Sequence, residues 1–150
     1  MIVLDASVAL KLLLPETDSA MALRLLHGPA VLAAPDILSF ELAAAIAKYY
    51  RRRLITLDEA RVAAAAAKRV VTDLHPSQPL LVPAFELSLL LGHAVYDCLY
   101  LVLARWLSVP LLTADRRMHG KAHRAGLAGQ VYLLDEMDRL LGTIATIAGR

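Results

Sequence analysis

The sequence predicts an α/β fold in which a parallel β-sheet is flanked by helices on both faces. Short apolar segments that suit strands alternate with longer segments of helical character, and this alternation is typical of parallel sheets. The strand candidates are also nearly continuous apolar runs, as strands buried on both faces are. With 150 residues, 58% of them hydrophobic, the chain is expected to form one domain over residues 1–150.

Most of the predicted elements begin or end at a recognisable local signal. Pro15 stops the first helix, and Gly28 closes the second. Thr56 followed by Glu59 is the pattern of a capping box at a helix start. The predicted strands are residues 2–4, 31–34, 79–82, 110–113 and 131–134. The predicted helices are residues 6–14, 17–27, 35–53, 56–74, 83–91, 96–107 and 115–125, with a helical C-terminal extension at 135–150.

Composition and charge restrict the class of protein. No apolar stretch approaches the ~18 residues that a membrane span needs, so no membrane partner is expected. No basic segment precedes Ile2 to indicate a secretory leader. The single cysteine, Cys98, excludes an intrachain disulfide framework and fits the reducing cytoplasm, where we expect the protein to be. The net charge of +2 is compatible with a nucleic-acid partner without requiring one.

Four acidic residues carry the functional prediction. Asp5, Asp97 and Asp115 lie where a predicted strand ends or a helix begins, and Glu41 lies in an otherwise apolar helix. The carboxyl ends of parallel strands meet at one crevice, so side chains placed there converge. Carboxylates gathered in one place repel each other unless a cation lies among them, and Mg²⁺ or Mn²⁺ prefers such oxygen ligands. The four acids therefore predict a metal site of the kind that nucleases use.

Each acid also has an ordinary structural interpretation. Asp is a favoured helix N-cap, which would explain Asp5, Asp97 or Asp115 taken singly. Glu41 could instead form an ion pair with Lys48 or an arginine. A helix cap needs one carboxylate and does not require several to face one crevice, so the four together favour the metal. Whether one or two ions bind stays open.

Hydroxyl and imidazole groups extend the list of candidates. Ser7 and Thr113 each lie two residues from one of the acids, where a hydroxyl could orient a carboxylate or a water molecule. Ordinary hydrogen bonding at a strand end is the equal alternative. His119 and His123 are four residues apart, but Gly120 weakens the helix between them, so a metal role for this pair is not favoured.

Four segments, in this order, resemble the PIN-domain ribonucleases, in particular the VapC-like toxins of type II toxin–antitoxin pairs. The segments are residues 3–11, 35–45, 96–104 and 112–116, and the resemblance spans roughly residues 1–134. It implies a Mg²⁺ or Mn²⁺ site made by Asp5, Glu41, Asp97 and Asp115, with Ser7 and Thr113 at the hydroxyl positions of the family.

The resemblance also implies an activity and partners. It implies cleavage of RNA, a homodimer, and a small VapB-like antitoxin whose tail lies across the active-site groove. Some members carry another acid two residues beyond the last Asp, where this chain has Arg117. Arg116 and Arg117 follow Asp115 directly and are predicted to contact RNA phosphates, while Arg51 to Arg53 are either an outer contact or a solvated helix end.

Other functions stay open at this point. The chain could be a nucleic-acid or protein-binding module with a degenerate metal site, or a nuclease whose substrate is DNA or a housekeeping RNA. For the homodimer, the helix predicted at 35–53 offers an apolar surface made by Leu42, Ile46, Tyr49 and Tyr50.

Overall fold

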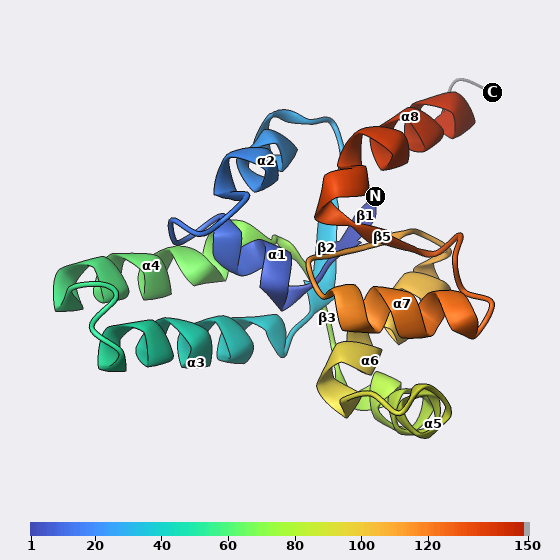
Figure 1. The fold of residues 1–150 in the computed structure, drawn as a ribbon, viewed down its shortest axis with the longest axis horizontal. Helices are drawn as coiled ribbons and strands as arrows, with labels where there is room; N and C mark the ends of the chain where they lie inside the picture. Colours follow the sequence, from blue (N-terminus) through green and yellow to red (C-terminus); the bar gives the residue numbers. More distant parts are fainter. Residues whose placement is uncertain (149–150) are drawn as a thin grey trace.

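The computed structural model describes residues 1–148 and contains one central parallel sheet (Figure 1). Its strands are β1 (Ile2–Leu4), β2 (Leu32–Pro35), β3 (Asp73–His75), β4 (Leu111–Thr113) and β5 (Val131–Leu133). They pair in the order β3-β2-β1-β4-β5, and all neighbours are parallel. The predicted fold class is confirmed.

The direction of the chain across the sheet places the helices on its two faces. The chain runs outward from β1 to β2 and β3, then returns past β1 to β4 and β5. Because crossovers between parallel strands are right-handed, helices of the outward and returning parts lie on opposite faces. The outward part contains α1 (Ala6–Lys11), α2 (Ser19–Leu23), α3 (Leu38–Arg51) and α4 (Leu57–Val70). The returning part contains α5 (Leu81–Leu91), α6 (Val95–Leu107) and α7 (Arg116–Arg124), and α8 (Met137–Ala148) follows β5 (Figure 1).

The topology creates a crevice at a defined place. The chain leaves β1 toward β2 and later arrives at β4 on the other side of β1, so the winding direction changes between β1 and β4. In open α/β sheets, ligands bind outside the carboxyl ends of the strands at such a switch point. Asp5 directly follows β1, and Asp115 lies two residues after the last residue of β4.

Helix α6 forms the centre of the hydrophobic core. All residues from Cys98 to Ala104 are buried, and the helix packs against β1, β2 and β4. A helix that is apolar around much of its circumference, as residues 98–104 are, is buried on several sides. Burial raises the pKa of the Cys98 thiol to about 11, so this residue stays protonated and serves as a small apolar side chain.

The third strand is where the predicted elements are wrong. Residues 79–82 were expected as a strand, but Gln78–Leu80 form a 3₁₀ turn that leads directly into α5. The true strand is Asp73–His75, where the end of a helix was expected. An edge strand pairs on one side only and lies partly in water, so it needs no continuous apolar run. Leu74, at its centre, is 37% exposed.

Two further differences concern α3. The helix begins at Leu38, later than predicted, and the preceding Asp36 instead accepts hydrogen bonds from Ser77 on the neighbouring connection. The predicted dimer surface on this helix is wrong for Leu42 and Ile46, because both belong to the core and are no more than 2% exposed. An i, i+4 pair of apolar residues marks the buried face of a helix as readily as an exposed interface.

The C-terminal extension is helical as far as the structure describes it. Residues 134–136 form a 3₁₀ turn and α8 follows, whereas residues 149 and 150 lie outside the described part of the chain. No single helix among the described residues is long and apolar enough to cross a membrane. The consecutive helical segments 78–91 and 95–107 would together be long and apolar enough for a span, by length and composition only, but they are bent by 113° at the break between them.

Candidate active site

The neighbouring Ser7 and the distant Thr113, on β4, both donate hydrogen bonds that hold Asp5 at the end of β1. Its side chain is buried, with 4% of the residue exposed. One carboxylate oxygen accepts the backbone N–H of Ser7 at 2.6 Å, and the other accepts the Thr113 hydroxyl at 2.5 Å. Ser7 Oγ in turn accepts the backbone N–H of Ala114 at 2.9 Å. The two predicted hydroxyl residues therefore connect β1 to β4 and fix the Asp5 carboxylate.

Asp97 and Asp115 meet on either side of an imidazole. Asp97 lies in the first turn of α6 and Asp115 is the N-cap of α7. His93, just before α6, places its Nε2 atom 2.9 Å from Asp97 Oδ2 and 3.4 Å from Asp115 Oδ2. One ligand atom from each of these three residues lies within 4.8 Å of the others. The N-terminal ends of α6 and α7 thus bring three potential metal ligands together.

Glu41 joins the site from the other face of the sheet. Because α3 begins at Leu38, Glu41 lies in its first turn, where the positive end of the helix dipole favours a carboxylate. The side chain is half-buried and accepts a hydrogen bond from the hydroxyl of Tyr100, on α6. Among the described residues Glu41 forms no ion pair with Lys48 or an arginine, so that alternative is not supported.

The charges of neighbouring acids contribute to the pKa shifts at the candidate site. Burial raises the pKa of Asp5, and the charge of Asp97 raises it further against the hydrogen bonds from Thr113 and Ser7. Burial also raises the pKa of Glu41, with further contributions from the charges of Asp5 and Asp97. For Asp97, burial and the charge of Asp115 raise the pKa, while His93 opposes the shift. Each acid therefore interacts with at least one other acid of the set.

Helix capping and ligand binding are compatible at these positions. Asp115 uses Oδ1 to accept the backbone N–H groups of Arg117 and Met118, while Oδ2 faces His93. Asp5 caps α1 through the Ser7 N–H. Asp97 makes no cap, because Ala94 is the N-cap of α6 and forms no side-chain cap bond. The capping interpretation thus explains two of the three aspartates and leaves the convergence of the set unexplained.

His93 is the site residue that sequence reasoning missed. Its side chain is 8% exposed, and Nε2 makes no hydrogen bond of acceptable geometry to the described residues, although Asp97 Oδ2 is near enough. The available signal was its position four residues before Asp97, one helical turn along the chain. The pair His119 and His123 instead forms stacked rings 3.9 Å apart, with His119 beside Glu136.

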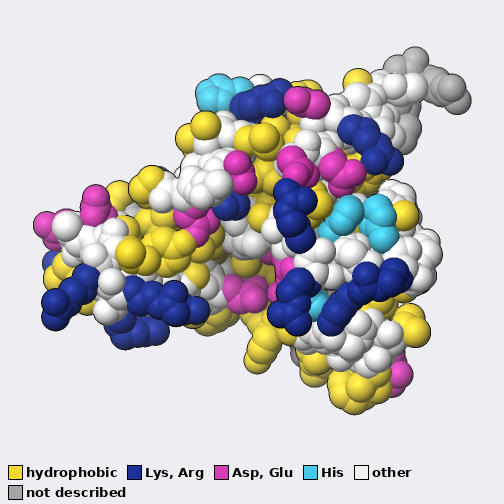
Figure 2. All heavy atoms as spheres, in the orientation of Figure 1, with side chains coloured by type: hydrophobic (Ala, Val, Ile, Leu, Met, Phe, Trp, Pro, Cys, Tyr) yellow, Lys and Arg dark blue, Asp and Glu magenta, His cyan; other side chains and the backbone are white. Residues whose placement is uncertain are grey.

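The two predicted RNA-binding arginines lie in different surroundings. Arg117 lines an open pocket with His93, Asp97 and Asp115, and Lys121 lines the same pocket. Arg116 turns away and pairs with Asp135 at 2.5 Å. Figure 2 shows Lys and Arg side chains gathered over α7 and over the outer end of the α3–α4 pair, with acidic side chains between them.

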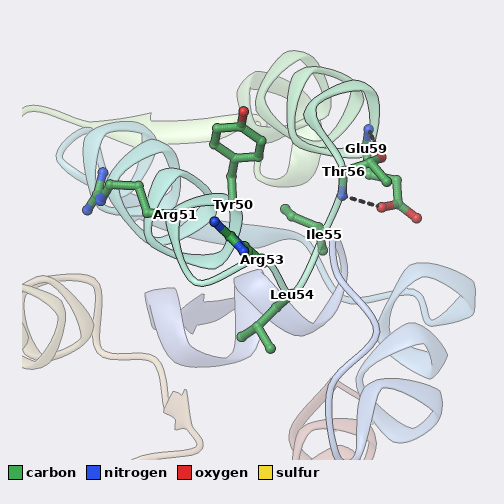
Figure 3. A pocket seen from close by; sticks show the side chains of 7 residues that line it. All are labelled: Tyr50, Arg51, Arg53, Leu54, Ile55, Thr56 and Glu59. Atoms are coloured by element: carbon green, nitrogen blue, oxygen red, sulfur yellow. Dashed lines mark hydrogen bonds between the residues drawn. The ribbon is translucent and has the colours of Figure 1, made fainter.

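A second pocket lies at the corner between α3 and α4. Figure 3 shows its side chains, with the Thr56–Glu59 capping box on one side; the lining residues are Tyr50, Arg51, Arg53, Leu54, Ile55, Thr56 and Glu59. This corner is the end of the helix pair away from the sheet (Figure 1). This pocket contains none of the four converging acids, so the pocket lined by His93, Asp97 and Asp115 is the better candidate for an active site.

The donor set at the switch point fits a divalent cation. The buried His93 Nε2 has no hydrogen-bond partner among the described residues and faces two carboxylates. Burial, with a smaller contribution from neighbouring acids, raises the pKa values of Asp5, Glu41 and Asp97, so a nearby positive charge would favour their ionised forms. A divalent ion would supply that charge and use the oxygen ligands that hard cations prefer.

Comparison with known proteins places this arrangement in a family. The family model of the PIN domain matches residues 2–124. Ribonuclease VapC1 of Mycobacterium tuberculosis is 34% identical over 134 residues, which cover 88% of this chain and 96% of the relative. Ribonuclease VapC12 of the same species is 36% identical, with 79% and 89% covered. Ribonuclease VapC3 of Pyrobaculum aerophilum is 34% identical, with 80% and 93% covered.

Solved structures agree on the fold. PAE2754 from Pyrobaculum aerophilum superposes with a TM-score of 0.66 at 18% identity, covering 95% of this chain and 96% of that one. VapC20 of Mycobacterium tuberculosis, a toxin that cleaves the sarcin–ricin loop, superposes with a TM-score of 0.63 at 19% identity, covering 77% and 91%. From the family model and the curated relatives together, the chain belongs to the PIN-domain family and is one of its VapC-like members.

Proposed function

We propose that this protein is a metal-dependent endoribonuclease that acts in the cytoplasm as the toxin of a toxin–antitoxin pair. The observation that carries the proposal is the convergence of Asp5, Glu41, Asp97 and Asp115 at the switch point of the sheet. Membership of the PIN-domain family supports it, as do the printed names of the curated relatives. By the same resemblance, a VapB-like antitoxin is the partner that silences the toxin.

The proposed chemistry assigns a task to each group of residues. When bound, Mg²⁺ or Mn²⁺ supplies Lewis acidity toward the phosphate and favours ionisation of the attacking water. Asp5, Asp97 and Asp115 would hold the ion, with Glu41 completing the acidic set. The Thr113 hydroxyl and the Ser7 backbone N–H both donate hydrogen bonds to Asp5 and keep its carboxylate in one orientation. Tyr100 does the same for Glu41.

Cleavage with and without metal tests the proposal. Purified protein should cleave single-stranded RNA in millimolar Mg²⁺ or Mn²⁺, stop in excess EDTA, and recover when the metal is restored. DNA of the same sequence is the matched control. Binding of RNA with no cleavage under any metal condition would favour the degenerate binding module, and equal cleavage of both substrates would favour a general nuclease.

The arginines near the site should differ in their contribution to RNA binding. Cations are needed because the phosphate backbone must approach a group of carboxylates. Arg117 lines the acidic pocket, whereas Arg116 is paired with Asp135, so we expect the larger effect on RNA binding at Arg117. Arg117→Ala should weaken RNA binding and reduce the slope of log K against log salt by about 0.7, the value for one phosphate contact on a single strand.

Titration of RNA at several salt concentrations measures this slope, with Arg116→Ala as the matched control. Arg116→Ala should change the slope less, and neither substitution should change metal affinity, because arginine is not a ligand. Equal slopes in the wild type and both variants would leave these residues as solvated helix charge and place the RNA path elsewhere.

The homodimer also stays a prediction, but we now expect its contact surface on α5 rather than on α3. Large exposed apolar side chains gather on α5, where Figure 2 shows a hydrophobic area. These residues are Leu81, Val82, Phe85, Leu89 and Leu90, each at least 48% exposed. Contiguous apolar surface of this kind is typical of protein–protein contacts. We therefore propose α5, rather than the buried face of α3, as the contact between two copies.

A further inference from the structure

We propose that His93 is a direct ligand of the metal ion, so that the centre has mixed nitrogen and oxygen ligands and binds Mn²⁺ more tightly than Mg²⁺. The inference rests on the proposed function for the presence of an ion. It goes further by naming a ligand outside the predicted acidic set and by choosing between the two cations.

The spacing of the donor atoms supports coordination. In an octahedral site with bonds of about 2.1 Å, adjacent ligand atoms lie about 3 Å apart. His93 Nε2 lies 2.9 Å from Asp97 Oδ2 and 3.4 Å from Asp115 Oδ2. One nitrogen and two oxygens at these separations can occupy adjacent positions around a single ion, with each residue offering one ligand atom.

The hydrogen bonding of His93 supports the same conclusion. A buried imidazole nitrogen normally has a well-aligned hydrogen-bond partner, because leaving a buried polar atom unsatisfied is unfavourable. Nε2 of His93 has none of acceptable geometry among the described residues, in a side chain that is 8% exposed. An ordinary core histidine would turn this nitrogen toward one acceptor. Here it faces the space between two carboxylates that come from different helices.

Two other histidines distinguish this arrangement from a simple ion pair. His75 and His119 also have a buried Nε2 without a hydrogen-bond partner among the described residues. Each of them faces a single carboxylate, Asp73 at 3.3 Å and Glu136 at 3.2 Å. Neither belongs to a group of three potential ligands within the described residues, whereas His93 does. His119 is therefore a matched control for His93.

The ligand chemistry selects the cation. Mg²⁺ is bound almost entirely through oxygen, while affinity for nitrogen ligands rises along the first transition row. An imidazole ligand would therefore add more to the binding of Mn²⁺ than to that of Mg²⁺. Burial also restricts the orientation of the His93 side chain, which is 8% exposed.

Electron spin-echo spectroscopy of bound Mn²⁺ tests the ligand directly. Directly coordinated imidazole nitrogen gives ¹⁴N modulation of the Mn²⁺ echo, which an all-oxygen site does not give. Wild-type protein loaded with one equivalent of Mn²⁺ should show this modulation. Protein labelled with ¹⁵N-histidine should replace it by the ¹⁵N pattern. This measurement needs no substitution, so it does not depend on a variant that folds.

Calorimetric titration with Mn²⁺ and with Mg²⁺ adds a second readout. His93→Gln offers an amide oxygen in place of the nitrogen and should lower the ratio of Mn²⁺ to Mg²⁺ affinity by about tenfold, the lower end of the effects seen around metal sites. It should also abolish the nitrogen modulation. His119→Gln should change neither quantity.

The possible outcomes separate this inference from the proposed function. Binding of Mn²⁺ without nitrogen modulation, or an unchanged affinity ratio in His93→Gln, would overturn the ligand assignment and leave the nuclease proposal standing. Modulation that also disappears in His119→Gln would assign the nitrogen elsewhere and overturn it too. Absence of any metal binding by the wild-type protein would overturn both.

Discussion

Asp5→Asn is expected to reduce RNA cleavage by at least about 100-fold, the scale for removing one group that stabilises transition-state charge. The folded structure should persist, because Asn caps a helix about as well as Asp and can still accept the Ser7 N–H. Its amide can donate to Thr113 Oγ1, which would then turn its own proton toward Ser7, 3.5 Å away. Cleavage assays and thermal melts with and without Mn²⁺ measure the two effects, and the rise in Tm on adding metal should disappear.

Asp36→Asn is the matched control for this prediction. Asp36 also follows a strand, β2, and also accepts hydrogen bonds through its carboxylate, from Ser77. It does not contribute to the pKa shifts of Asp5, Glu41 or Asp97. The control should keep its cleavage rate and its metal-induced rise in Tm. Equal losses in both variants, or full activity in Asp5→Asn, would contradict the assignment of Asp5.

The same variant carries a pH signature in metal-free solution. The pKa of Asp5 is raised in the folded protein, so the protonated acid favours folding below its ordinary value of 3.8. That contribution is lost as the pH rises through the folded-state pKa. In EDTA, the free energy of unfolding of Asp5→Asn should therefore increase relative to that of the wild type as the pH rises. Glu59, whose hydrogen bonds to Thr56 lower its pKa, should give the opposite slope in Glu59→Gln.

Leu101→Ala should lower the free energy of unfolding by about 2–5 kcal/mol, the range for removing a fully buried leucine side chain. Leu101 is 0% exposed and lies at the middle of α6, the helix that packs on β1, β2 and β4. Interior packing is dense, so the neighbouring side chains can collapse into the resulting cavity only in part. Urea unfolding of the metal-free protein gives the value.

Leu54→Ala makes the same chemical change at a residue that is 63% exposed, outside the core. It should cost no more than about 0.5 kcal/mol, as most surface substitutions do. If the two variants lost similar free energy, α6 would not be the centre of the core. Retention of full stability in Leu101→Ala would lead to the same conclusion.

Much of the architecture could be read from the sequence because local and tertiary requirements agree there. The segment Ile2–Leu4 is apolar throughout and is buried on both faces as the central strand. The capping box of Thr56 and Glu59 also forms as predicted, since it depends only on residues three positions apart. At these places a short-range pattern is sufficient, and the fold does not override it.

The edge strand shows where short-range patterns fail. Apolar residues at 79–82 look like a strand in a short window, but the longer window has helical spacing. The buried residues Leu80, Ala84, Leu87 and Leu91 recur every three or four positions, and Ser88 beside Leu87 lies on the same face. Residues 73–75, by contrast, become a strand only because β2 offers them free backbone groups. That pairing is a tertiary event without a local signal.

The acids of the candidate site could be predicted, but their neighbours could not. Strand ends mark Asp5 and Asp115 in the sequence, whereas the contact between Glu41 and Tyr100 joins residues 59 positions apart. The relation of His93 to Asp97 is local, yet its approach to Asp115 depends on how α6 and α7 pack. Composition carries no information about such distances.

The hydrogen bond between Thr113 and Asp5 spans 108 positions of sequence, and this has a consequence for protein synthesis. A ribosome synthesises Asp5 long before it reaches β4 and the α7 cap. Domains fold as units once the required segments have emerged, so β1 has no β4 neighbour during most of elongation. A nascent chain therefore lacks the assembled acidic cluster until β4 and the start of α7 have left the ribosome. A product that ends before residue 111 would lack β4 and Asp115, so we expect it not to cleave RNA.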